Sequence, residues 1–69
     1  MDAGKTGAYL AALRKARGMT QQEAADQLGV SNKTVSKWEN GAGLPDITVL
    51  PALAELYGVT ADDILAGET

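Results

Sequence analysis

The sequence contains no cysteine, no histidine and no phenylalanine among its 69 residues. Without cysteine there can be no disulfide and no thiol nucleophile, and without either cysteine or histidine the common zinc sites and imidazole catalysis are excluded. A metal ion could be bound only by oxygen ligands, and no group of carboxylates is spaced so that it would bind one. We therefore expect no metal, no cofactor and no enzymatic activity.

Long apolar runs are also missing. No stretch approaches the roughly 20 residues that cross a bilayer, and residues 1–5 lack the apolar segment of a secretion signal, so we expect a cytoplasmic protein that binds no membrane. The composition, 45% hydrophobic and 22% charged, is that of a folded globular chain. A chain of this length buries only about 60% of the surface that its unfolded form exposes, which predicts one small domain over residues 1–69.

Basic residues are scarce, with six Lys and Arg against nine Asp and Glu, for a net charge of −3. As a bulk value, this charge argues against a polyanionic partner such as DNA. The distribution of these charges along the chain gives a different expectation. Residues 1–38 hold all six basic and three acidic residues, whereas residues 39–69 hold six acidic and no basic residues. This asymmetry predicts a dipolar domain, basic over residues 1–38 and acidic over residues 39–69. Such a domain would present its first half to an anionic partner.

Glycine and proline divide the chain into five segments of helical length, and strand patterns are almost absent. The predicted helices cover about residues 6–17, 20–28, 31–40, 48–57 and 60–66. Thr20 begins the second helix in a capping box with Glu23, while Ser31 and Thr60 are favourable N-caps for the third and fifth. We predict an all-α fold without a sheet.

The start of the fourth helix is constrained by Pro51, which cannot donate an intrahelical hydrogen bond. If Thr48 is the N-cap, Pro51 occupies the third helical position, where the amide needs no intrahelical partner. We therefore predict that the helix begins after Thr48 and that Asp46 and Ile47 form an entry turn.

Only a short connection around Gly29 joins the second and third predicted helices, and such helices must cross sharply, as in a helix-turn-helix. Residues 20–41, TQQEAADQLGVSNKTVSKWENG, resemble the Cro/CI-type helix-turn-helix family (the XRE family) of phage repressors and bacterial regulators. The resemblance extends to the family's first helix and last two helices, through Gly7, Leu10, Leu13, Arg14, Gly18 and residues 44–65. It implies a compact five-helix lambda-repressor-like DNA-binding domain with its core at about residues 6–66, acting in transcription regulation.

The third helix carries the residues that we expect to read DNA. If Val35 and Trp38 point into the core, the outward face holds Asn32, Lys33, Ser36 and Lys37. Asn pairs with adenine and Lys with guanine in the major groove, so these four side chains are the predicted base readers. The alternative is that they form an ordinary solvated helix face.

Phosphate contacts are expected on either side of the reading helix, at Gln21, Ser31, Thr34, Asn40 and Gly41. Gln21 lies at the start of the second helix, where free amides favour a phosphate, and the family resemblance implies that its side chain clamps one. An ordinary helix end before glycine explains Asn40 and Gly41 equally well.

The resemblance also implies a partly buried ion pair between Arg14 and Glu39, which would tie the first helix to the end of the third. This sequence departs from the family at Ala24, where Leu is common, and in residues 41–46, where relatives often carry a cation. The smaller side chain leaves volume to be filled by neighbours, and the uncharged loop weakens attraction to phosphates.

The expected partner is a double-stranded DNA operator bound by a homodimer, because regulators of this type read two half-sites about 34 Å apart. The sequence indicates no small-molecule ligand. An alternative function is that of an antitoxin or adaptor, in which the same fold binds another protein through an apolar surface formed by Tyr57, Ile64 and Leu65. Specific, salt-dependent DNA binding would distinguish the two.

Overall fold

The computed structural model describes all 69 residues and contains five α-helices and no strand. The helices are α1 (Ala3–Ala16), α2 (Gln21–Leu28), α3 (Asn32–Glu39), α4 (Leu50–Tyr57) and α5 (Ala61–Ala66). This confirms the predicted fold class and the number of helices. No helix combines the length and the apolar character that crossing a membrane requires.

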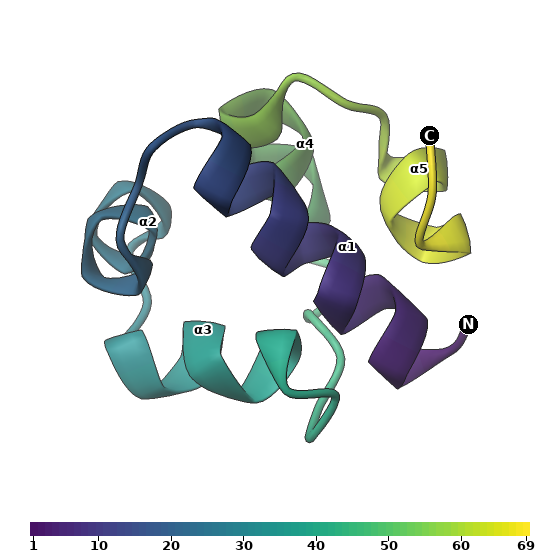
Figure 1. Cartoon of the computed structure of the whole chain (residues 1–69), viewed down its shortest axis with the longest axis horizontal. Helices are drawn as coiled ribbons and strands as arrows, with labels where there is room; N and C mark the ends of the chain where they lie inside the picture. The colour runs from purple at the N-terminus through teal and green to yellow at the C-terminus, as the bar shows by residue number, and fades with distance from the viewer.

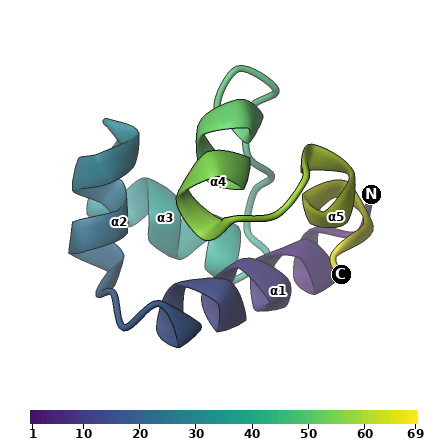
Figure 2. The ribbon, with the colours of Figure 1, turned by 90° about the horizontal axis from the view of Figure 1, so that it is seen from above.

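Helix α1 runs through the middle of the molecule, with α2 and α3 on one side and α5 on the other (Figure 1). Seen from above, α4 lies between α2 and α5, and the two chain ends lie near one another beside α5 (Figure 2). The body measures 24 × 23 × 22 Å along its principal axes. Helix α3 lies along one edge of the domain in this view (Figure 1).

Every helix contributes to one apolar core, which consists of Leu10, Ala25, Val35, Trp38, Leu50, Leu53, Tyr57 and Ile64. Val35 and Trp38 are only 2% and 7% exposed, so α3 points these two side chains inward as its sequence predicts. The orientation of α3 about its own axis is fixed by this burial.

Helices α2, α3 and α5 begin where the capping residues predict. Thr20 Oγ1 accepts a hydrogen bond from the amide of Glu23 at 3.1 Å, and the Glu23 carboxylate accepts one from the amide of Thr20 at 2.9 Å. Thr60 and Asp63 form the same reciprocal pair at the start of α5, and Ser31 caps α3. These caps depend on residues within three positions of one another, which is why the sequence alone locates them.

Helix α1 begins at Ala3, three residues before the predicted start at residue 6. The Asp2 side chain accepts a hydrogen bond from the amide of Lys5 at 3.0 Å and caps the helix there. An N-cap contributes about 1 kcal/mol, which offsets the cost of placing Gly4 in a helix.

The predicted start of α4 is wrong by one residue, because Val49 is the N-cap and has no side-chain hydrogen bond. The Asp46 side chain accepts from the amide of Thr48 at 3.2 Å, and the Asp46 carbonyl accepts from the amide of Val49 at 3.0 Å. Asp46 thus begins the predicted entry turn, but the turn includes Thr48 and is one residue longer than expected. Pro51 is then the second helical residue, where its missing amide is again harmless.

Helices α1 and α3 approach so closely that only glycine fits between them at position 7. A Cβ atom on Gly7 would stand 2.2 Å from the Trp38 carbonyl oxygen and 3.0 Å from that of Glu39. Both carbonyls belong to the last turn of α3. Gly7 therefore lets α1 support the C-terminal end of α3 directly.

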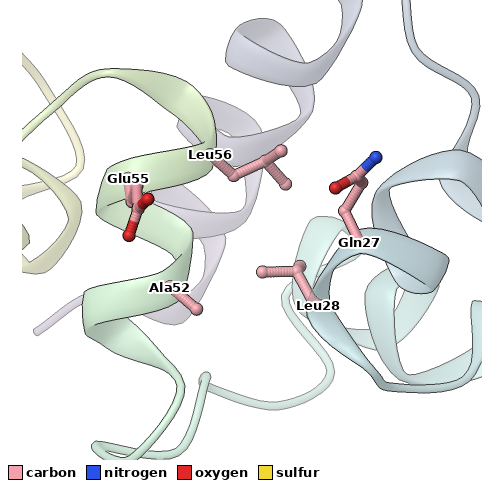
Figure 3. Close-up of a pocket in the computed structure, with 5 residues that line it drawn as sticks. All are labelled: Gln27, Leu28, Ala52, Glu55 and Leu56. Carbon is pink, nitrogen blue, oxygen red and sulfur yellow. The ribbon is translucent and has the colours of Figure 1, made fainter.

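Ala24 is completely buried, so neighbouring groups enclose the smaller side chain. A shallow hollow of about 380 Å³ opens between α2 and α4, where Leu28 and Leu56 extend toward one another (Figure 3). Its lining consists of Gln27, Leu28, Ala52, Glu55 and Leu56. The only charged side chain there is acidic, so this hollow offers no counter-charge to a phosphate.

Candidate nucleic-acid interface

The outward face of α3 is polar and carries two cations. Asn32, Lys33 and Lys37 are exposed, and Ser36 is half-buried beside them. Because successive helical residues turn by about 100°, burial of Val35 and Trp38 leaves these four on the opposite side. The four predicted base readers therefore share one face, whose amide and ammonium groups match the acceptors and donors of base edges.

The starts of α2 and α3 supply unpaired backbone donors. Gln21 and Gln22 are the first two residues of α2, and Asn32 and Lys33 are the first two of α3, so their amides have no intrahelical acceptor. The positive ends of both helix dipoles reinforce these donors. Two groups of backbone amides suited to anions thus lie at the helix starts.

The hydroxyl groups of Ser31 and Thr34 are already engaged with each other. Ser31 Oγ accepts from the Thr34 amide at 3.1 Å, and the two hydroxyl oxygens lie 2.9 Å apart. Both hydroxyls can still accept or donate a further hydrogen bond. Their first role is to hold the start of α3.

Asn40 and Gly41 form an ordinary helix end. The Asn40 amide donates to the Ser36 carbonyl at 3.0 Å, and the Gly41 amide donates to the Trp38 carbonyl at 3.1 Å. Gly41 has a φ of +74°, and the Asn40 side chain donates to Ser36 Oγ at 3.3 Å. The sequence left two interpretations open, a phosphate contact and an ordinary helix end. This geometry favours a helix end for the two backbone amides. The Asn40 side chain is left as the donor available to a phosphate.

Arg14 and Glu39 form a two-pronged ion pair that joins α1 to the end of α3. Arg14 Nε donates to one Glu39 carboxylate oxygen at 2.8 Å, and Nη2 donates to the other at 2.9 Å. A third donor, Nη1, reaches the carbonyl of Met19 at 2.8 Å in the connection before α2. The two side chains are only 11% and 5% exposed, so this pair is shielded from solvent.

Burial and hydrogen bonding act on the Glu39 carboxyl in opposite directions. Burial raises its pKa, but the hydrogen bonds from Arg14 and Gln21, together with the charges of Arg14 and Lys15, outweigh burial and leave the pKa below its ordinary value. Burial raises the pKa of the nearby Tyr57 hydroxyl, and the negative charge of Glu39 adds to that effect. Glu39 is therefore a fixed anion at neutral pH.

Gln21 also contacts Glu39, a contact that the sequence analysis missed. Its side-chain Nε2 donates to Glu39 Oε1 at 3.1 Å. The two residues are 18 positions apart and lie on different helices, so neither periodicity nor capping rules give a signal for the contact. The predicted phosphate ligand at the start of α2 is thus tied to the last residue of α3.

The six cations differ in location, and Lys15 lies exposed in the last turn of α1. Lys5 pairs with Glu68 beside α5, and Arg14 is neutralised by Glu39. The Arg17 guanidinium packs over Gly58, at the end of α4. Only Lys33 and Lys37 lie on α3 itself, so the positive charge at this helix is smaller than the count of basic residues in the first half of the chain suggests.

The apolar surface considered for a protein partner is largely absent. Tyr57 and Ile64 are 4% and 0% exposed and belong to the core, which leaves only Leu65, at 37%, on the surface. Tyr57 and Ile64 close the core over α5, and the interpretation of all three residues as a docking surface is wrong.

Comparison with known proteins places this geometry in a family. The helix-turn-helix family model HTH_3 matches residues 10–64. The HTH-type transcriptional activator BcrR of Enterococcus faecalis is 41% identical over 56 residues, which is 81% of this chain and 28% of BcrR. The uncharacterized HTH-type transcriptional regulator YazB of Bacillus subtilis is 31% identical over 68 residues and 99% of each chain.

A solved structure is similar as well. The clp gene regulator ClgR from C. glutamicum superimposes with a TM-score of 0.81 and 25% sequence identity, over 97% of this chain and 87% of that chain. The chain spans 28%, 56% and 51% of the length of BcrR, YonR and AnsR, the last two from Bacillus subtilis. On the match to the family model and the identity to these relatives, the chain belongs to the Cro/CI-type (XRE) helix-turn-helix family.

Proposed function

We propose that this chain binds double-stranded DNA sequence-specifically as part of a prokaryotic or phage transcriptional regulator. The observation that carries the proposal is the outward face of α3, where Asn32, Lys33 and Lys37 are exposed on a helix whose other side is fixed in the core. An α-helix with amide and ammonium groups on one face fits the major groove. The names of BcrR, YazB and ClgR as regulators support the same function.

In this proposal Asn32, Lys33, Ser36 and Lys37 read base edges, and the starts of the two helices hold the phosphates on either side. The proposed phosphate ligands are Gln21, Ser31, Thr34, Asn40 and Gly41, with Gly41 acting by shaping the backbone, since its amide is engaged within the helix end. The protein would act in the cytoplasm, where bacterial DNA lies.

We further propose that two copies bind one operator. A body 24 Å long faces about seven base pairs, because the rise per base pair is about 3.4 Å. With two of the six cations engaged in ion pairs, at most about four phosphates can be neutralised by each chain, for a salt slope of about −3.6 or shallower. Such weak backbone attraction makes a second copy, about 34 Å along the duplex, necessary for high occupancy.

The test is selection of bound duplexes from a random DNA pool, followed by affinity measurements on the enriched site. Lys37→Ala should lower affinity for that site by about 10- to 100-fold, because a good base contact contributes about 1–3 kcal/mol. Lys5→Ala is the matched control, since it removes a cation that pairs with Glu68 away from α3, and it should change affinity less than about twofold.

Two results would contradict the proposal. If the pool yields no enriched sequence, the isolated chain does not read DNA. If Lys5→Ala and Lys37→Ala reduce affinity equally while both remain folded, DNA is bound through overall charge and α3 is not the reading helix.

A further inference from the structure

We infer that Gln21 is a positioning residue for α3, one that couples the phosphate contact at the start of α2 to base reading through Glu39. This inference rests on the proposed function, because it requires that α3 reads DNA. It assigns Gln21 a role beyond that of a phosphate ligand.

The contacts around Glu39 carry the inference. Oε1 accepts from Gln21 Nε2 at 3.1 Å and from Arg14 Nη2 at 2.9 Å, while Oε2 accepts from Arg14 Nε at 2.8 Å. Three donors from α1 and α2 thus converge on the last residue of α3. Hydrogen bonds to a buried carboxylate are stronger than those between neutral groups, so this carboxylate links the three helices firmly.

The position of Glu39 makes the link relevant to base reading. Glu39 follows Lys37 by two residues in a helix only about 12 Å long, so a rotation or shift at this end moves the whole reading face. Functional side chains must be held to within about 0.5 Å to make paired hydrogen bonds. Arg14 and Gln21 restrain the same carboxylate from two different helices.

The chemistry of the Gln21 amide allows both roles at once. Nε2 carries two hydrogens, of which one donates to Glu39, so the other remains for a phosphate oxygen. A phosphate bound there would hold the amide, and the amide would hold the end of α3. Binding of a DNA phosphate to Gln21 would therefore favour the arrangement of α3 that reads bases.

The test compares Gln21→Met with Gln22→Met. Methionine has nearly the length of glutamine but no donor, and Gln22 is a matched control because its amide donates only to Asp26 within α2, at 2.8 Å. Affinity for the enriched operator and for an unrelated duplex is measured over a salt series, at a temperature where circular dichroism shows every variant to be folded. A contribution to stability alone would not change the ratio of these two affinities.

We expect Gln21→Met to lose about tenfold or more in operator affinity, but less than about threefold for the unrelated duplex. Gln22→Met should change neither. Combination with Lys37→Ala should be non-additive, because a displaced α3 has already weakened the Lys37 contact. Gln21→Asn retains an amide but withdraws it from Glu39 by one methylene, and it should show the same selective loss.

The inference is overturned if Gln21→Met weakens both duplexes equally and adds to Lys37→Ala, since Gln21 would then act only as a phosphate ligand. It is also overturned if Gln21→Asn retains operator specificity, because the reach to Glu39 would not matter. Failure of the proposed function looks different, since the wild-type protein would then enrich no duplex at all.

Discussion

Helix α1 makes two ion pairs with distant parts of the chain, and burial distinguishes them. The Arg14 and Glu39 side chains, between α1 and α3, are 11% and 5% exposed, whereas Lys5 and Glu68, between α1 and the C-terminus, are 52% and 63% exposed. Solvent and salt screen the exposed pair, so its contribution is small. Losing one partner of the buried pair leaves a charge with neither water nor counter-ion, so removing either partner alone destabilises the fold.

The two contacts therefore support the fold in different ways. On the α3 side, the ion pair and the close approach at Gly7 together hold the C-terminal end of α3. On the α5 side, Thr6 Oγ1 donates to the Ile64 carbonyl at 3.0 Å within the protein interior, and Gly67 packs against the backbone of Thr6. Helix α5 is thus held by buried packing, with little contribution from its ion pair.

The largest effect is expected from Arg14→Met. It leaves Glu39 buried without its counter-charge, which should cost about 3–5 kcal/mol, a large part of the stability of a chain of this size. Urea unfolding followed by circular dichroism measures the change. The double variant Arg14→Met/Glu39→Met is the control and should recover most of the loss, since apolar side chains can replace a buried pair. An unchanged midpoint in the single variant would show that the pair does not support the fold.

A smaller loss is expected from Gly7→Ala. The added methyl group overlaps the Trp38 carbonyl oxygen, so α1 and α3 must separate, at a cost of about 1–3 kcal/mol. Gly4→Ala is the matched control in the same helix, where the new Cβ would meet only a side-chain oxygen of Asp2, at 3.4 Å. That change should leave stability equal or slightly higher, because alanine favours helix. Equal losses in the two variants would contradict the close contact at Gly7.

The acid sensitivity of the fold should follow the buried pair. The pKa of Glu39 lies below its ordinary value of 4.5, so ionised Glu39 stabilises the fold above that pH, and this stability is lost as the pH falls through the lowered pKa. Urea midpoints should therefore fall as the pH drops below about 4.5. Arg14→Met/Glu39→Met should flatten this dependence.

The exposed pair provides the control for acid sensitivity. The hydrogen bond and charge of Lys5 also lower the pKa of Glu68, but that carboxyl is open to solvent. Glu68→Gln should therefore retain nearly the whole dependence on acid pH. If Glu68→Gln flattens the curve instead, the exposed pair is the acid-sensitive contact.

The smallest effect is expected from Lys5→Met. Its ammonium pairs with Glu68 on the surface, where screening leaves little net stabilisation. The Tm should remain within the error of the measurement in low salt, and the variant should coincide with wild type in high salt. A shift in Tm comparable to that of Arg14→Met would show that burial is not what separates the two pairs.

Short-range signals explain why so much of the fold was predictable. The capping boxes at Thr20 and Thr60 and the cap at Ser31 depend on residues three positions apart, and the inward direction of Val35 and Trp38 follows from their spacing. Thr48 shows the limit of this reasoning. Its hydroxyl is suited to a cap, but the neighbouring Asp46 captures its amide and carries the turn one residue further.

The sequence by itself determined the five helices, the caps of α2, α3 and α5 and the identity of the side chains on the outer face of α3, because these depend on neighbours along the chain. Only the tertiary structure decided which cations remain free and what Gln21 contacts. Lys5 and Gln21 find their partners 63 and 18 positions away, through helix packing that no local pattern encodes. The charge around α3 is therefore a property of the folded molecule, since packing neutralises some cations and leaves others exposed to solvent.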